Sequence, residues 1–411
     1  MLLRIYVFIG CLGATLACRD DSVQQESVQD EVFTEYLSEN HRPLTLTDNQ
    51  IDFGVSEEVL EQSHIFLTGE IHGVAANAEL NYAWLQYLVS HAGVRYYLAE
   101  LPYSTGQLLN YYLASGNEAT LNRVFQPLEE TLSCTQENYA FWQKVYALNQ
   151  GLPQNERVQA IGADIEHQTG SAIAYLATLL PESEAPENIS GLMQLIRQVP
   201  SQSKGLYTSL ISDLQASIAS QADVYESYLD DNWLDFQLVV DNLAQRSFAY
   251  ETREQAGQAA FNQVHDSLIY QNFAQVYPQL LPGKFYGQWE AIHISQHEQS
   301  GTRWFGAYLR EFKDIQPLSV LSLLYLYQDC QRMERSGSAT SFQMHPTEPP
   351  FHSLVSTPYT LFDLNQPASP FHEPLIWLSG LGTLPDKGNT TDFFQYALLI
   401  RGSAAASQLS L

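Results

Sequence analysis

The sequence predicts an α/β fold with a central mixed, largely parallel sheet flanked by helices. From about residue 63 to residue 180, short apolar runs of strand length alternate with helical repeats of apolar residues. Strands that alternate with helices are joined by crossover connections, so the strands lie side by side and parallel. A long stretch of helical periodicity then interrupts the alternation and predicts a helical insertion at about residues 185–278.

The spacing of apolar residues gives the individual elements. In the first predicted helix, Leu80, Trp84, Tyr87 and Leu88 recur at helical spacing. The first predicted elements in chain order are strand 64–68, helix 75–91, strand 96–100, helix 105–114, strand 157–163 and helix 171–180. Three long helical patterns at 207–275 make up most of the insertion, and later strands are predicted at 283–295, 318–327, 359–364, 374–378 and 393–400.

The N-terminus has the pattern of an export signal. One early arginine precedes an apolar stretch and a small-residue approach to Cys18, so we expect a signal peptide at residues 1–17. The segment resembles a bacterial lipoprotein signal, with Cys18 as the lipidated residue and ordinary signal cleavage as the alternative. Residues 18–40 are predicted to be a flexible acidic tether, and residues 41–411 a single catalytic or binding domain. We therefore expect an exported protein, lipid-anchored in the bacterial cell envelope.

Charge and cysteine content limit the possible partners. The chain has 19 Lys and Arg against 46 Asp and Glu, a formal net charge of -27, so its average field repels phosphates. No nucleic-acid partner is expected, and membrane contact is expected only through the lipid anchor. Cys134 and Cys330 remain beyond the signal segment. A disulfide between them is left open, and the lack of a CxxC pair argues against a thiolate zinc site.

Several predicted strands end on an acid. The first apolar run ends on Glu70, the second on Glu100 and the third on Asp164. Ligands of open parallel sheets bind beyond the carboxyl ends of the strands, so these acids are expected to meet there. His72 lies two residues after Glu70, and on extended backbone both side chains lean to one side. A histidine can act near neutral pH as base, acid or metal ligand, although a structural role is the alternative for His72.

A second histidine ends a later apolar run. His293 closes the run 285–294, and Glu290 precedes it by three residues. The alternative is a buried histidine satisfied by backbone groups. His297 is expected to face solvent.

Further polar residues are expected to support the site. In the last helix of the insertion, His265 and Asn272 are seven residues apart near the Leu268 face and are predicted to point toward the sheet, with ordinary polar positions on the helix surface as the alternative. Asp266 is rotated away from that face and is expected on the surface. Glu166 and His167 follow Asp164 directly, and one of them is expected to cap the next helix.

These motifs together resemble a known superfamily. Gly69-Glu70-Ile71-His72-Gly73, Glu100, Gly162-Ala163-Asp164 and His293 are similar to the motifs that group erythromycin esterases, ChaN-like haem-uptake lipoproteins and Tiki/TraB proteins. The segment 265–272 looks like the RDxxMAxN helix of the esterases, with His265 in place of Arg. The resemblance covers roughly residues 51–400.

The resemblance implies a shared cleft lined by Glu70, His72, Glu100 and His293. In the esterases such a cleft activates water for attack on an ester, in Tiki-like members it holds a divalent metal, and in ChaN-like members the surface binds haem. A set of two histidines and two carboxylates suits zinc or manganese. Asp164, His265, Asn272 and Glu290 are then supporting residues. Two departures argue against macrolide specificity: one residue fewer separates Glu70 from His72, and Glu290 takes the place of a histidine.

The expected function is therefore hydrolysis of an ester or amide bond in a small-molecule or peptide substrate by water that His and Glu side chains activate. Glu70, His72, Glu100 and His293 would also be the ligands of a divalent metal, if one is used. Two alternatives stay open: a surface lipoprotein that binds haem or another ligand without turnover, and a protein whose cleft has lost its activity.

Overall fold

The computed structural model describes residues 31–47, 50–198, 204–299, 301–312, 319–346, 351–373 and 387–411. The strands are β1 (His41–Leu44), β2 (Ile65–Glu70), β3 (Val94–Pro102), β4 (Gln159–Asp164), β5 (Lys284–Glu290), β6 (Val320–Met333), β7 (Ala339–Met344), β8 (Tyr359–Asp363) and β9 (Tyr396–Arg401). The helices are α2 (Glu57–Gln62), α3 (Ala75–Ala92), α4 (Tyr103–Ser115), α5 (Glu118–Phe125), α6 (Gln136–Gly151), α7 (Thr169–Leu179), α8 (Glu187–Gln198), α9 (Lys204–Leu229), α10 (Trp233–Ala256), α11 (Gln258–Val276), α12 (Phe305–Arg310) and α13 (Thr390–Phe393).

The strands form one mixed sheet with a parallel centre. Their order is β1-β8-β9-β6-β2-β5-β3-β4, and β7 pairs with β6 outside this path. The strands from β9 to β4 in this order pair in parallel, whereas β1, β8 and β7 pair antiparallel. β2 lies between two parallel neighbours and is buried along its whole length, as expected from an uninterrupted apolar run. The predicted largely parallel sheet is confirmed.

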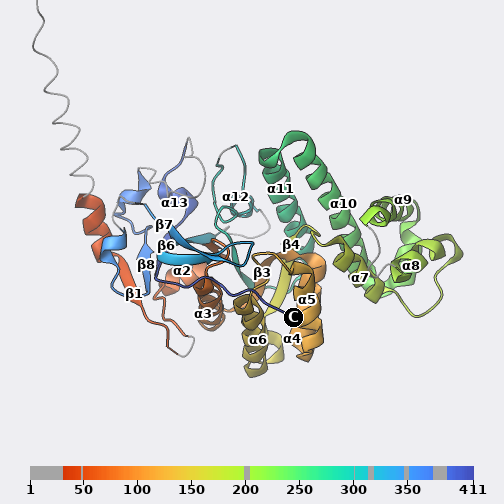
Figure 1. Cartoon of the computed structure of the whole chain (residues 1–411), viewed down its shortest axis with the longest axis horizontal. Coiled ribbons are helices and arrows are strands. Elements are labelled where there is room, and N and C mark those ends of the chain that lie inside the picture. The colour runs from red at the N-terminus through yellow and green to blue at the C-terminus, as the bar shows by residue number, and fades with distance from the viewer. Residues whose placement is uncertain are drawn as a thin grey trace, which may run out of the picture.

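Helices cover both faces of the sheet. α3, α4 and α6 lie on one side of it, and α11 and α12 lie on the other (Figure 1). The predicted helix at 75–91 is confirmed as α3, which ends at Gly93, a residue with the positive φ of 71° that favours glycine. The first three predicted strands and their helices are all found within a few residues of the expected ends.

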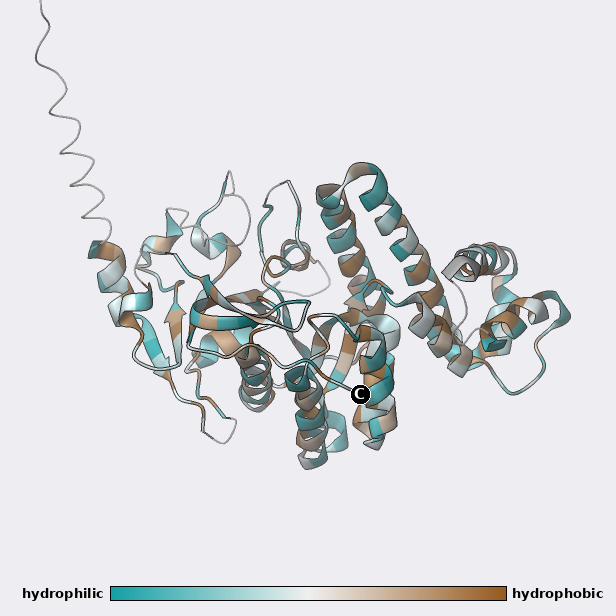
Figure 2. Ribbon diagram, in the orientation of Figure 1, coloured by the Kyte–Doolittle hydropathy of each residue, from teal (hydrophilic) through white to brown (hydrophobic). Residues whose placement is uncertain are grey.

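The helical insertion is also confirmed. It contains α8, α9, α10 and α11, of which α8 and α9 lie far from the sheet (Figure 1). α10 and α11 form a hairpin whose apolar and polar residues alternate along both helices (Figure 2). α11 returns to the sheet and packs against β4 and α12. This contact brings its polar residues to the carboxyl ends of the strands.

The predicted tether is too long. Residues 31–39 form a helix, and Phe33, Tyr36 and Leu37 within it are buried. The Tyr36 hydroxyl donates a hydrogen bond to the carbonyl oxygen of Asp363 at 2.9 Å. The ordered domain therefore begins before residue 41, because apolar residues inside the acidic segment pack against the sheet edge. Residues 1–30, including Cys18, lie outside the described residues, so the signal peptide and lipid anchor stay predictions.

Other boundaries differ from the sequence-based expectations. The strand predicted at 283–295 ends at Glu290, and His293 lies in the turn that follows, where its N–H donates to the Glu290 carbonyl at 3.0 Å. β1 and β7 were not predicted, and the strand expected at 374–378 lies outside the described residues. Cys134 and Cys330 are buried free thiols. Within the described ranges, no helix is both long enough and apolar enough to span a bilayer.

Candidate active site

Four carboxylates gather where neighbouring strands end. Asp164 ends β4, Glu100 lies near the end of β3, Glu290 ends β5 and Glu70 ends β2. These four strands are adjacent in the sheet, so the predicted meeting of distant acids at one edge is confirmed. The register of β3 shifts between Ala99 and Pro102, next to Glu100. Such an irregularity re-aims a side chain relative to its regular strand neighbours.

Glu70 and His72 form the first carboxylate–imidazole pair. His72 Nδ1 contacts Glu70 Oε1, and the Asn77 amide donates to Glu70 Oε2. The Tyr327 hydroxyl fixes Asn77 by donating to its Oδ1 at 2.9 Å, and it accepts the Ile71 N–H at 2.9 Å. Burial lowers the pKa of His72, but the carboxylates of Glu70, Glu100 and Glu290 together outweigh it, Glu70 most of all, and raise the pKa to about 10.

Asp266 and His293 form a second pair. His293 Nδ1 lies 2.8 Å from Asp266 Oδ1, which also accepts the Phe305 N–H at 2.8 Å. The expected surface position of Asp266 is wrong: its side chain is fully buried, because α12 covers a second side of α11. Burial lowers the pKa of His293, but the carboxylates of Asp266, Glu100 and Glu290 together outweigh it, Asp266 most of all, and raise the pKa to about 10.

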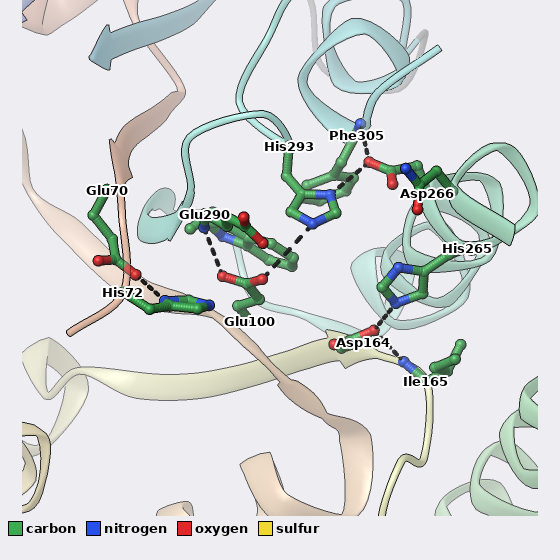
Figure 3. A network of polar contacts seen from close by, with 12 residues as sticks. Glu70, His72, Glu100, Asp164, Ile165, His265, Asp266, Glu290, His293 and Phe305 are labelled. Carbon is green, nitrogen blue, oxygen red and sulfur yellow. Dashed lines mark hydrogen bonds and ion pairs between the residues drawn. The ribbon is translucent and has the colours of Figure 1, made fainter. Parts of the chain in front are cut away.

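Glu100 lies between the two imidazoles (Figure 3). Its Oε2 accepts the Glu290 N–H at 2.7 Å. Its Oε1 is 3.8 Å from His293 Nε2 and makes no hydrogen bond to any described residue. The His72 ring has one end toward Glu70 and the other toward Glu100 (Figure 3). Burial raises the pKa of Glu100 to about 7, against the opposing effects of His293 and His72.

A third cluster surrounds Asp164. His265 Nε2 lies 2.6 Å from Asp164 Oδ1, and His167 Nε2 lies 3.0 Å from Asp164 Oδ2. Burial alone would raise the pKa of Asp164, but these two imidazoles outweigh it and hold the pKa well below its usual range. The inward orientation predicted for His265 and Asn272 is confirmed, and the Asn272 amide donates to the Ala163 carbonyl at 3.2 Å.

Neither residue expected to cap the next helix does so. Gln168 takes the N-cap position of α7, without a side-chain hydrogen bond. Glu166 instead accepts the Ser104 N–H at 2.9 Å and its hydroxyl at 2.7 Å, which satisfies the start of α4. His167 turns to Asp164. The sequence did not predict the site contacts of Asn77, Asp266 and His167. The signal that identifies His167 is its position three residues after Asp164, the acid that ends β4.

A cavity of about 290 Å³ opens beside these groups. His72, Glu100, Asp164 and His167 line it, whereas His293 and His265 do not. One part of its wall is aromatic, formed by Tyr97, Phe125, Phe141 and Trp142. No Lys or Arg is among the described lining residues. His72 and Glu100 are therefore accessible from this cavity, whereas His293 lies behind Glu100.

Comparisons with solved structures identify the fold. A His-to-Asn mutant of erythromycin esterase EreC in its open conformation superposes with a TM-score of 0.63 at 15% identity, covering 90% of this chain and 99% of that one. The fold is that of erythromycin esterase. A Bacillus cereus protein (TM-score 0.64, 17% identity) and a succinoglycan biosynthesis protein (0.65, 15%) each cover 93% of this chain and 99% of their own. No protein-family model and no functionally curated protein matches the sequence.

The four residues predicted to share a metal do not form one ligand set on this erythromycin-esterase fold. Glu70 is engaged by His72 and Asn77, and His293 Nδ1 is engaged by Asp266. Among the described residues, three other groups bring their ligand atoms within 4.8 Å of one another, namely His72 with Glu100 and Glu290, His265 with Asp266 and His293, and Asp164 with His167 and His265.

Proposed function

We propose that the protein is a hydrolase that activates water for attack on an ester bond, in a small-molecule substrate that enters the cavity beside Glu100. The observation that carries this proposal is the position of Glu100, which lies between two carboxylate-paired imidazoles and lines the cavity. The likeness to erythromycin esterase supports the reaction class. The substrate specificity of that enzyme is not carried over, because the identity is only 15%.

Glu100 is the proton acceptor in this proposal. Its Oε2 is fixed by the Glu290 N–H, whereas Oε1 has no hydrogen-bond partner in the described part of the chain and is able to take a proton from water. A pKa of about 7 suits a general base at neutral pH. About half of the Glu100 carboxyl groups are then ionised, and the carboxylate is still basic enough to take a proton from water. The water oxygen then attacks the carbonyl carbon, and its proton moves to Glu100.

His72 is the proton donor. With a pKa of about 10 it carries a proton at neutral pH, and its far ring nitrogen points away from Glu70 toward Glu100. It donates to the carbonyl oxygen as negative charge develops there. When the carbon–oxygen bond of the ester breaks, His72 protonates the leaving alkoxide. The proton that Glu100 took from water then moves to His72, so that both groups return to their starting protonation states. His293, held by Asp266, is a positioning residue that keeps a positive charge behind Glu100.

The test is hydrolysis of a panel of chromogenic esters and amides. We expect ester turnover by the wild type and a loss of about 10²–10⁴-fold in kcat/KM in Glu100→Gln, the size expected for removal of a general base. Glu137→Gln is the matched control, because Glu137 also lines the cavity but bonds the Ser407 N–H. Equal rates in Glu100→Gln and wild type would overturn the proposal. Tight binding of haem, seen as a Soret band, without any turnover would instead support the ligand-binding alternative.

We also propose that the protein is exported and anchored through a lipid on Cys18. The sequence pattern of the first 18 residues supports this assignment. Incorporation of labelled palmitate in a bacterial host, lost in Cys18→Ser, is the expected result. Release of an unlabelled soluble protein by both forms would contradict lipidation and support ordinary signal cleavage.

A further inference from the structure

We propose that Asp164, His167 and His265 form a binding site for one divalent transition-metal ion of the zinc class. This site is separate from the proton-transfer groups around Glu100, and the proposal does not rest on the proposed hydrolysis. The three residues come from the end of β4, the loop after it and α11. Their ligand atoms lie within 4.8 Å of one another.

The two imidazoles converge on opposite oxygens of one carboxylate. His265 Nε2 lies 2.6 Å from Asp164 Oδ1 across 101 residues of sequence, and His167 Nε2 lies 3.0 Å from Oδ2. A tetrahedral zinc ion with bonds of about 2.0–2.1 Å keeps its ligand atoms about 3.3–3.4 Å apart. The two carboxylate–imidazole separations would therefore have to widen by less than about 1 Å to reach the spacing of zinc ligands.

Surrounding groups hold these side chains in a ligand-like orientation. The His167 Nδ1 lies 3.0 Å from the Tyr250 hydroxyl, which leaves Nε2 directed at Asp164. Metal-bound histidines are oriented in this way by a partner on the other ring nitrogen. Asp164 is held in place through its backbone, because the Asn242 amide donates to its carbonyl oxygen at 3.0 Å. The cluster is also largely buried, with Asp164 and His265 5% and 8% exposed.

The donor set determines the class of ion. Two imidazole nitrogens and one carboxylate oxygen suit zinc and its first-row neighbours, whereas magnesium and calcium prefer oxygen ligands. Asp164 and His167 line the cavity, so a further coordination position would face it. Three protein ligands with one open position is the arrangement of metal sites that admit water or a substrate atom.

The other two groups are weaker candidates. His72, Glu100 and Glu290 supply one imidazole only, and the Glu290 residue is exposed. In the third group, none of His265, Asp266 and His293 lines the cavity, so an ion there would have no coordination position open to it. The competing explanation for the Asp164 cluster is a metal-free ion triad that fastens α11 to β4.

The experiment is titration of the chelator-treated full chain with Co²⁺ and Zn²⁺, followed by calorimetry and by the visible absorption of bound Co²⁺. We expect one equivalent to bind. The dissociation constant should rise at least about 100-fold in His265→Ala and in His167→Gln, since even loss of an outer-shell partner costs about 10–100-fold. His297→Ala is the control, because His297 is half-buried against Phe393 and outside the cluster.

Two outcomes would overturn the site. One is the absence of Co²⁺ binding by the wild type, which would leave the ion triad as the explanation. The other is binding that does not depend on the cluster, because it is unchanged in both cluster variants. Loss of that binding in His72→Ala alone would assign the metal to the group around Glu100. If His265→Ala does not fold, His167→Gln decides, because the His167 side chain is 25% exposed and Gln retains a hydrogen-bonding group. No substrate is needed, so a failure here is distinct from a failure of the proposed hydrolysis.

Discussion

The two carboxylate–imidazole pairs have similar chemistry but are built differently. Glu70 and His72 are two residues apart at the end of one strand, with side chains 9% and 31% exposed. Asp266 and His293 are 27 residues apart on a helix and a turn, with side chains 0% and 9% exposed. The first pair lines the cavity and the second does not. We propose that the first pair serves chemistry and that the second mainly serves stability and the orientation of Glu100.

The largest expected effect is on stability and belongs to the second pair. Asp266→Ala leaves a buried imidazole without its partner and should reduce the free energy of unfolding by about 3–5 kcal/mol. Glu70→Ala should cost about 1–2 kcal/mol, because water can reach the partly exposed His72. Urea denaturation of both variants measures the difference. Equal losses would show that the two pairs do not differ in this way.

The next effect is on catalysis and belongs to the first pair. His72→Gln removes the proposed proton donor and should lower kcat about 100-fold, while the free energy of unfolding changes by less than about 1 kcal/mol. His297→Ala provides a matched histidine control away from the cavity. A kcat within about twofold of the wild-type value would remove His72 from the mechanism.

The pH dependence separates the pairs further. Ionisation of Glu100 requires kcat/KM to rise through a pH of about 7, and protonation of His72 requires it to fall through about 10. Glu70→Gln removes the carboxylate that raises the pKa of His72, so the alkaline limb should move to lower pH. Asp266→Asn removes the carboxylate that keeps His293 charged, so the pKa of Glu100 and the acid limb should move to higher pH. A shift of the acid limb in Glu70→Gln, or of the alkaline limb in Asp266→Asn, would contradict these assignments.

The smallest effect concerns support of the first pair from β6. Tyr327→Phe removes the hydroxyl that accepts the Ile71 N–H and donates to Asn77. We expect a loss of about 1–2 kcal/mol in the free energy of unfolding, the cost of leaving buried polar groups unsatisfied, with less than about a tenfold loss of kcat. Tyr325→Phe is the neighbouring control, since the Tyr325 hydroxyl is also buried but lies beside Thr68 and bonds neither Ile71 nor Asn77. Similar losses in both variants would contradict this role of Tyr327.

The same contrast explains which parts of the structure could be predicted from sequence. Glu70, Glu100 and Asp164 were predictable because each ends an apolar run, and parallel strands bring such ends to one edge. The Glu70–His72 pair follows from local backbone geometry. The inward position of His265 follows from the spacing of one apolar face of α11.

The contacts of Asp266 could not be predicted in this way. Helical spacing identifies one buried face, but α11 packs against β4 on one side and α12 on another. The covering residue, Phe305, is 39 positions away, and the spacing within α11 contains no signal for it. The helix at residues 31–39 was missed for a related reason, since its few apolar residues are buried only by the distant sheet edge that contains Asp363.

The proposed mechanism requires that Glu100 lies between two protonated imidazoles in the resting protein. Nitrogen-15 NMR of histidine-labelled protein tests it without a substrate, with His72→Gln and His293→Gln used to assign the two rings. We predict that both rings show imidazolium shifts at about pH 8 and lose their protons only as the pH approaches about 10. Titration of both rings near about pH 6.5, the value of a free histidine, would contradict the claim.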